Sequence, residues 1–307
     1  MTDWQERITA GTDPSVRAEH ALRYAGAAPI VRAAATWCDL GCGIGLAAGA
    51  ATDGPFGGVL ILVDADAPSV VQAAAHLQVQ ATVPLAADLN VAADRAAIRA
   101  AVLDAPAPRA ITCFEVLEHV RDLPSVVALL LELATEHDTT VVLSVPNDGF
   151  GAVANPFHET VWSVAAFGEL RAMLPEHHMF AEQVPLRGSR LRVQGAELPA
   201  DAVVEPHEGA VASHFIAAFG PAAERLRGGA RILETDQRGE RSWTRQRESD
   251  LAYLEAKGTE QAAELVTLRA LAAQMDDWRR YIHELEDRLG IPRAGTDAGM
   301  ALERRSA

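Results

Sequence analysis

Three ionisable side chains stand close together in one short segment, FEVLEHV at residues 114–120: Glu115, Glu118 and His119. Carboxylates and imidazoles are ligands for divalent cations, and they also serve as general bases. The two glutamates lie three residues apart, so they share a face if a helical turn begins there. The segment therefore predicts metal ligands, a base, or only the solvated start of a helix.

A further histidine, His158, occurs in the stretch VPNDGFGAVANPFHETVWSVAAF at 145–167. It reaches the first group only if this stretch folds back toward it. Asn147 and Asp148, in the same stretch, either touch a substrate or form a turn. His214 lies in an apolar run and is expected to be a satisfied core residue.

A glycine-rich loop is found in WCDLGCGIG at 37–45. Asp39 comes just before three alternating glycines, Gly41, Gly43 and Gly45. Glycines at such a turn let the backbone approach a ligand closely. The acid at the start suits a cationic ligand with an amino group better than a pyrophosphate.

Two more acids follow predicted strands, Asp64 in LILVDAD and Asp88 in PLAADLN. A carboxylate at the end of the second strand accepts hydrogen bonds from the two hydroxyls of a ribose. An acid at the end of the third strand can meet an adenine amino group. Together with the glycine loop, these acids predict a nucleoside pocket.

The elements that must position these residues are short β-rich runs alternating with Ala- and Leu-rich helical stretches. This alternation predicts a doubly wound α/β fold with a mostly parallel sheet, and ligands on such sheets bind beyond the carboxyl ends of the strands. The predicted strands are 36–40, 58–63, 82–86, 110–114 and 139–145, followed by 178–185 and 212–219 after an insertion at 187–210. The predicted helical stretches are 45–52, 67–76, 92–103, 123–136 and 163–174.

Over roughly residues 15–220 the sequence resembles the class I S-adenosylmethionine-dependent methyltransferases. DLGCGIG is similar to their first motif, Asp64 to their ribose-binding acid, and ADL at 87–89 to their adenine contact, which involves Asp88 and Leu89. The resemblance implies S-adenosylmethionine as cofactor and a Rossmann-like sheet of seven strands. The last strand, ASHFIAAF, is expected to be antiparallel. A nicotinamide enzyme is the alternative for the glycine loop.

The segment AEHALRYAGAA at 18–28 resembles an H-x-x-R-Y element of methyltransferases from bacterial surface-glycan loci. The resemblance implies that Arg23 pairs with the cofactor carboxylate and that Tyr24 covers the sulfonium, since a ring face suits a cation. The alternative is that Arg23 is solvated and Tyr24 packs on the sheet.

The pattern E-x-x-E-H resembles ubiquinone-pathway O-methyltransferases and small-RNA 2′-O-methyltransferases. In the second group two glutamates and the following histidine bind Mg²⁺ with another histidine from beyond strand five. This resemblance implies a site for Mg²⁺ or Mn²⁺ made of Glu115, Glu118, His119 and His158, with Glu115 also near the cofactor. Without a metal, His119 or His158 becomes the catalytic base. The loop here is shorter than in that group, and its NPFH differs.

Charge and composition exclude several classes of protein. The 307 residues carry a formal charge of −15, and an acidic body repels phosphate backbones, so a nucleic-acid partner is not expected. The start MTDWQERITAGTD is not a secretion signal, and apolar runs such as VVALLLELA are too short to span a bilayer. Three cysteines without CxxC spacing predict no disulfide or zinc site. A cytoplasmic protein is predicted.

The chain changes character after residue 220. We expect a methyltransferase domain at 1–220, a linker at 221–244, a coiled-coil helix at 245–289 and a disordered tail at 290–307. Apolar positions at spacings of three and four predict the coil, which would join a second copy of the chain or a partner helix. The alternative is one amphipathic helix packed on its own domain.

These features together predict an O-methyltransferase that acts on a hydroxyl of a sugar or glycan in polysaccharide biosynthesis. A hydroxyl needs a base or a metal to shed its proton, which is the role expected for the E-x-x-E-H group. Three alternatives remain open: a quinone or natural-product O-methyltransferase, an RNA 2′-O-methyltransferase, and a cofactor-binding scaffold that acts through its coil.

Overall fold

The computed structural model describes residues 8–9, 11–52, 54, 56–150, 155, 157–186, 210–230 and 237–290, with side chains in the last range described at 253 and from 256 onward. The chain divides into two compact units, Met1–Glu240 and Arg241–Ala307.

The first unit is built on one sheet of seven strands in the order β3-β2-β1-β4-β5-β7-β6. Strand β7 pairs antiparallel with both of its neighbours, whereas all other pairs are parallel. This confirms the predicted fold and the predicted antiparallel last strand. The strands are β1 (Thr36–Leu40), β2 (Val59–Asp64), β3 (Ala81–Ala86), β4 (Arg109–Phe114), β5 (Thr139–Pro146), β6 (His178–Gln183) and β7 (His214–Phe219).

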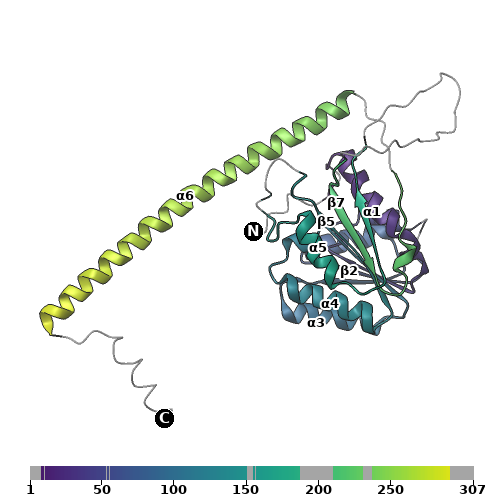
Figure 1. Cartoon of the computed structure of the whole chain (residues 1–307), viewed down its shortest axis with the longest axis horizontal. Helices are drawn as coiled ribbons and strands as arrows, with labels where there is room; N and C mark the ends of the chain where they lie inside the picture. The colour runs from purple at the N-terminus through teal and green to yellow at the C-terminus, as the bar shows by residue number, and fades with distance from the viewer. Residues whose placement is uncertain are drawn as a thin grey trace, which may run out of the picture. The chain divides into compact units, whose positions relative to one another are not determined.

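Helices cover both faces of the sheet, as Figure 1 shows. Helices α1 (Pro14–Ala33) and α2 (Ala67–Leu77) pack on one face. Helices α3 (Ala92–Asp104), α4 (Leu123–Glu136) and α5 (Val164–Met173) pack on the other. Strands β1 and β4 are buried along almost their whole length, as expected of central parallel strands.

Local sequence signals set the helix starts. The Asp13 side chain accepts a hydrogen bond from the Ser15 backbone N–H at 2.8 Å, and α1 has a proline in its first turn. The Asp66 side chain caps α2 by accepting from the Ser69 N–H at 3.1 Å. Ser163 caps α5 in the same way, through the Ala166 N–H at 3.2 Å. The capped α2 and α5 begin within one residue of their expected starts.

One predicted helix is wrong. The stretch 45–52, which follows the glycine loop, forms only a short 3-10 turn at Ala48–Ala51. The reason lies in the loop itself, because Gly45 has a φ of +76°, outside the right-handed helical region. The predicted insertion at 187–210 lies outside the described residues except for residue 210.

The described part of the second unit is formed by the helix α6 (Gln237–Leu289), whose first residues belong to the first unit. It starts inside the predicted linker 221–244 rather than near residue 245, and that linker also holds a 3-10 turn at Ala223–Arg225. Large apolar side chains are exposed along the described part of α6, and they are Leu265, Val266, Leu268, Leu271, Met275, Trp278, Tyr281, Ile282 and Leu289. Pairing through this surface stays a prediction, and residues 291–307 lie outside the described part.

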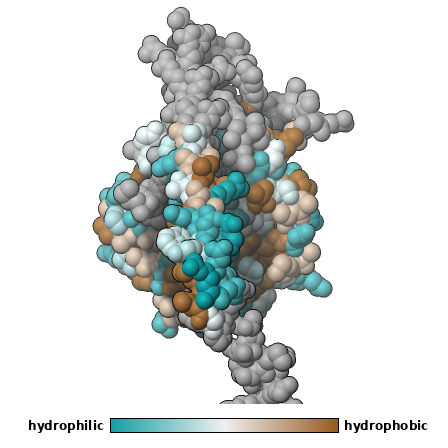
Figure 2. Space-filling model, turned by 90° about the vertical axis from the view of Figure 1, so that its left-hand side faces the viewer, coloured by the Kyte–Doolittle hydropathy of each residue, from teal (hydrophilic) through white to brown (hydrophobic). Residues whose placement is uncertain are grey.

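The surface drawn in Figure 2 carries a band of hydrophilic residues with hydrophobic residues on either side of it. This is a mixed surface and not one continuous apolar face. Among the residues that the structure describes, no helix combines the length and the apolar composition needed to cross a membrane.

Candidate active site

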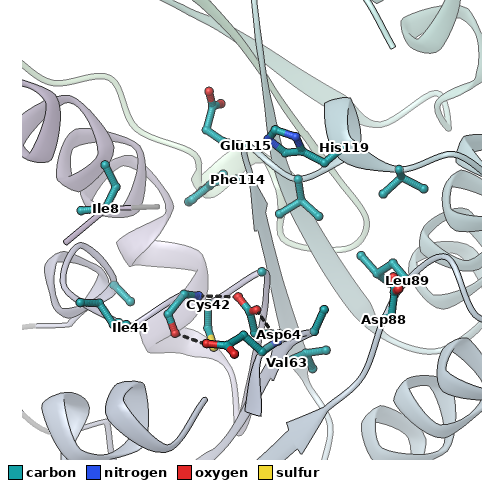
Figure 3. A pocket seen from close by; sticks show the side chains of 18 of the residues that line it. Ile8, Cys42, Ile44, Val63, Asp64, Asp88, Leu89, Phe114, Glu115 and His119 are labelled. Carbon is teal, nitrogen blue, oxygen red and sulfur yellow. Dashed lines mark hydrogen bonds between the residues drawn. The ribbon is translucent and has the colours of Figure 1, made fainter. Parts of the chain in front are cut away.

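A cavity of about 680 Å³ is lined by the glycine loop and by the segments that follow β2, β3 and β4. In Figure 3, Asp64 lies toward one end of this cavity and Glu115 and His119 toward the other. This is the place at which parallel sheets of this topology bind ligands. Predicted site residues that line the cavity are Tyr24, Gly41, Gly43, Gly45, Asp64, Asp88, Leu89, Glu115 and His119.

The glycine loop depends on glycine at two positions in particular. Gly41 has a φ of +72°, and a Cβ atom there would lie 2.3 Å from Cγ2 of Val116. Gly45 has a φ of +76°, and its Cβ would lie 2.9 Å from Cα of Ala73. A side chain at either place would be both strained and crowded. The sequence therefore folds into a bare loop that leaves the cavity open.

The acids predicted to bind a nucleoside are held rigidly. Asp64 is 8% exposed, and its two carboxylate oxygens accept from the N–H groups of Gly43 and Asp66, each at 2.9 Å. Asp88 accepts from the Asn90 N–H at 2.8 Å. Both acids face the same cavity (Figure 3). Two fixed carboxylates at the ends of neighbouring strands suit the hydroxyl and amino donors of a nucleoside.

Asp39, predicted to bind cofactor, is placed beneath the cavity and not in its lining. It is fully buried and accepts from the Tyr24 hydroxyl at 3.0 Å and from the Thr112 hydroxyl at 2.6 Å. Burial raises its pKa to about 7, although these two hydrogen bonds oppose that rise. Asp39 therefore acts on the cavity through Tyr24, whose ring packs edge-on against Phe114 at 4.8 Å between centroids.

Arg23 is not the solvated helix residue of the alternative hypothesis, and its pairing with the cofactor carboxylate stays a prediction. Its side chain is 4% exposed, so it is not solvated, and it does not line the cavity. Its Nη1 donates to the side-chain oxygen of Gln183 at 2.9 Å. This bond ties α1 to the end of β6, and the charge of Arg23 acts on the neighbouring Glu115.

Three residues of the predicted metal site come together. One ligand atom each from Glu118, His119 and His158 lies within 4.8 Å of the other two. The rings of His119 and His158 meet edge to face, with 5.3 Å between their centroids. His119 lines the cavity, whereas Glu118 and His158 lie behind it. A carboxylate with two imidazoles is a donor set that suits Mn²⁺, Fe²⁺ or Co²⁺, and Mg²⁺ less well.

The backbone explains how His158 reaches this group. The carbonyl oxygen of Glu118 accepts from the N–H groups of Glu159 at 2.7 Å and Thr160 at 3.1 Å. The stretch after β5 is thereby fastened to the 3-10 turn at Leu117–His119. The fold-back that the sequence required is present.

The orientation of His119 is also set by the backbone. Its Nδ1 lies 3.1 Å from the carbonyl oxygen of Phe157. A carbonyl only accepts, so Nδ1 carries the proton and Nε2 carries the lone pair. A lone pair on Nε2 can bind a cation or accept a proton.

Glu115 does not join this group, contrary to the four-ligand prediction. Its carboxylate accepts from the Ser144 hydroxyl at 2.7 Å and lies 3.1 Å from Nε2 of His214. The reason is the backbone: Glu115 directly follows β4 and has a φ of +56°, so it precedes the 3-10 turn and is not part of its face. His214 is thereby satisfied, as expected, but at the start of β7 beside the cavity.

The charges around Glu115 are unusual. Burial raises the pKa of Glu115, but Arg23 and His214 outweigh burial and hold that pKa well below its ordinary value. Burial and the charge of Arg23 lower the pKa of His20 to about 3, and His20 lines the cavity as a neutral ring. Sequence reasoning had not assigned His20 or His214 to the site; the H of the H-x-x-R-Y element was the signal for the first.

Comparison with known proteins identifies a family for the first unit of the chain. A family model described as a methyltransferase domain matches residues 15–190. The crystal structure of the small RNA methyltransferase HEN1 is 18% identical with a TM-score of 0.46, and the match covers 73% of this chain and 28% of that one. No curated protein matches the chain.

Two further solved structures match the chain with comparable sequence identities and TM-scores. The methyltransferase domain of bacterial CtHen1-C is 16% identical with a TM-score of 0.43, covering 66% of this chain and 98% of that one. The N-terminal domain of EvdMO1, solved with SAH and D-fucose, is 16% identical with a TM-score of 0.37, covering 69% and 84%. The chain spans little more than a quarter of the HEN1 chain.

Proposed function

The chain belongs to the class I S-adenosylmethionine-dependent methyltransferases, and from that premise we propose that it methylates a hydroxyl of a sugar or glycan with the help of a divalent metal ion. The observation that carries the proposal is the grouping of Glu118 and His158 with His119, which lines the cavity. Oxygen methylation needs such a group, because a hydroxyl at neutral pH is a poor nucleophile.

The cofactor end of the cavity supports the first half of the proposal. Bound S-adenosylmethionine supplies an electrophilic methyl group. Asp64 and Asp88 would hold its ribose and adenine, and the glycine loop leaves room for the rest of the molecule. Tyr24 lines the cavity, and the hydrogen bond from its hydroxyl to Asp39 holds its ring in one orientation.

The metal end supports the second half. Glu118, His119 and His158 would hold Mn²⁺ or Mg²⁺, and a cation bound there lowers the pKa of a hydroxyl that contacts it. Glu115 is left out of this set because Ser144 and His214 engage its carboxylate. If no metal binds, His119 is the better-placed base of the two histidines, since it lines the cavity and its Nε2 carries the lone pair.

Charge favours a sugar or glycan over an RNA acceptor. The acceptor end of the cavity includes Glu115 and Glu159, with Arg121 as a basic residue beside them. Residues 1–220 hold 12 Lys and Arg against 26 Asp and Glu, a net charge of −14. A polyanion meets repulsion on such a body, whereas a neutral sugar diol does not.

The helix α6 would join a second copy or a partner helix through its exposed apolar positions, such as Leu265, Leu268, Met275 and Ile282. Removal of 245–289 should then convert an oligomer into a monomer, as measured by light scattering. A full-length chain that is already monomeric would exclude pairing with itself. A cytoplasmic location stays a prediction.

The proposed reaction is tested with S-adenosylmethionine labelled in its methyl group. The purified chain is offered neutral sugar diols, catechol-type phenols and RNA with a free 3′ end, each with EDTA or with added Mn²⁺ or Mg²⁺. The proposal expects label on the sugar, lost in EDTA and restored by metal. Label on the phenol or the RNA would contradict the proposed sugar acceptor. Full activity in EDTA would contradict the proposed role of a metal ion. No transfer to any of these hydroxyls would favour the alternative of a cofactor-binding scaffold.

A further inference from the structure

Asp148 contacts Nδ1 of His158, and its role is inferred here on the basis of the proposed function of His158. We propose that Asp148 is a positioning residue, which holds the His158 ring with its proton on Nδ1 and so keeps the lone pair on Nε2, the nitrogen that would bind a metal ion together with Glu118 and His119. Asp148 lies in the loop after β5 and does not line the cavity, so it acts on the reaction only through His158.

Asp148 is bound to His158 and to the backbone at the same time. Its Oδ1 lies 2.7 Å from Nδ1 of His158, and its Oδ2 accepts from the backbone N–H of Trp162 at 2.5 Å. The Asp148 N–H donates in turn to the Trp162 carbonyl at 2.9 Å. Trp162 is 2% exposed and anchored in the core. The carboxylate is therefore fixed, and one of its two oxygens is reserved for the imidazole.

The partner of the other ring nitrogen, Nε2, independently indicates the same tautomer of His158. Nε2 of His158 lies 2.9 Å from the side-chain nitrogen of Asn155. The amide orientation of Asn155 is decided by its oxygen, which accepts from the Phe157 N–H at 3.0 Å. The NH₂ group therefore faces His158, and because an amide nitrogen only donates, Nε2 must accept.

Two neighbours thus select one tautomer, with the proton on Nδ1 and the lone pair on Nε2. His119 has the same tautomer for a similar reason, since Phe157 accepts from its Nδ1. Carboxylates that hold the far nitrogen of a metal-binding histidine fix the ring and raise its basicity. Asp148 would supply this support at His158, and the bond from Asn155 is the one that a cation or a proton at Nε2 would replace.

The test reads the tautomer directly, by long-range ¹H–¹⁵N correlation of the histidine rings in the metal-free chain. The wild-type His158 should show the proton on Nδ1. In Asp148→Asn a single oxygen replaces two, and the Trp162 N–H cannot change its role. The oxygen should therefore stay with Trp162 and the amide NH₂ should face Nδ1 of His158. Because the Asn155 NH₂ still faces Nε2, both ring nitrogens then meet a donor, so the single wild-type tautomer should give way to a mixture of the two tautomers. The affinity for Mn²⁺ should fall by about 10- to 100-fold.

Glu159→Gln is the matched control, because it removes one negative charge from the residue next to His158. It should leave the tautomer unchanged. A wild-type ring with its proton on Nε2 would overturn the proposal without any variant, and so would an Asp148→Asn chain that keeps both the wild-type tautomer and the wild-type Mn²⁺ affinity. If the tautomer responds as expected but the wild type binds no Mn²⁺, the proposed metal fails while the positioning role of Asp148 stands.

Discussion

Two groups of acid and histidine lie near the same cavity, and they differ in how their side chains are arranged. On one side, Glu118, His119 and His158 converge with both rings turned so that Nε2 carries a lone pair. On the other side, Glu115 and His214 are paired with each other, and Ser144 and Ser213 engage them further. The first group is a donor set that would suit a cation or a proton, whereas in the second group the carboxylate of Glu115 and the ring of His214 are engaged with each other.

The difference arises within a single heptapeptide. Glu115 and Glu118 are three residues apart, but Glu115 sits at a φ of +56° before the 3-10 turn, and Glu118 lies inside that turn. The chain direction therefore sends one carboxylate toward β7 and the other toward the loop after β5. Spacing in the sequence defines a shared face only when one regular element contains both residues.

The comparison is tested most strongly by Glu118→Gln. If Glu118 is a ligand, its loss should weaken Mn²⁺ binding by at least about a thousandfold, since even outer partners of ligands contribute 10- to 100-fold. Calorimetry with Mn²⁺ measures this, and S-adenosylhomocysteine affinity should stay the same as a control for folding. Unchanged Mn²⁺ binding would contradict the role of Glu118 as a metal ligand.

The buried carboxyl group of Asp39 should make the free energy of unfolding depend on pH. Burial raises the pKa of Asp39 from 3.8 to about 7. The protonated form is therefore favoured by folding, so this contribution to stability is complete below about pH 4 and is lost as the pH rises through 7. From pH 4 to 8 it should lower the free energy of unfolding by roughly 3 to 4 kcal/mol.

Urea unfolding across this pH range measures the Asp39 contribution, and Asp39→Asn should flatten the dependence. Asp104 is exposed, so Asp104→Asn is a fitting control and should retain the slope. An Asp39→Asn chain with the wild-type slope would show that Asp39 stays charged beneath Tyr24.

Glu115→Gln should give the opposite pattern to Glu118→Gln. The substitution leaves Arg23 and His214 without their carboxylate, which should lower the free energy of unfolding by about 2 kcal/mol, because a partly buried charge loses its partner. Mn²⁺ affinity should change by less than about threefold. A loss of Mn²⁺ binding as large as that of Glu118→Gln would mean that Glu115 leaves His214 to become a ligand, and the two sides would then be one site.

The smallest effect is expected at the far end of the cavity. Asp64→Ala should weaken S-adenosylhomocysteine binding by at least about tenfold, since charge-assisted hydrogen bonds contribute roughly 1.5–3 kcal/mol each. Mn²⁺ binding should not change, because Asp64 does not belong to the donor set. Equal cofactor affinity in the wild type and the variant, measured by calorimetry, would remove Asp64 from the cofactor site.

Most of the fold was predictable from the sequence because each element carries its own signal. The parallel strands are apolar runs of five to eight residues, and Asp66 and Ser163 mark helix starts through their caps. The helix expected at 45–52 failed because glycines at positive φ, needed for the loop, are incompatible with a regular helix there.

The site was predictable only in part, since pairings across the fold have no local signal. Three of the four expected ligand residues converge, but the partner of Glu115 comes from β7, which is inserted between β5 and β6. Arg23 and Asp39 were assigned to the cofactor on their motifs; the structure shows both buried, with partners on Gln183, Tyr24 and Thr112 that the motifs did not indicate. The tautomer of His158 depends on Asp148 and Asn155, whose geometry exists only once the loop has folded back.

The central claim is that the Glu118 side of the cavity, and not the Glu115 side, holds a metal ion. A crystal grown with S-adenosylhomocysteine and Mn²⁺ tests it through the anomalous signal of manganese. The account predicts one peak at ligand distance, about 2.0 to 2.3 Å, from Glu118, His119 and His158. A peak between Glu115 and His214, or no peak in the cavity at saturating Mn²⁺, would contradict it.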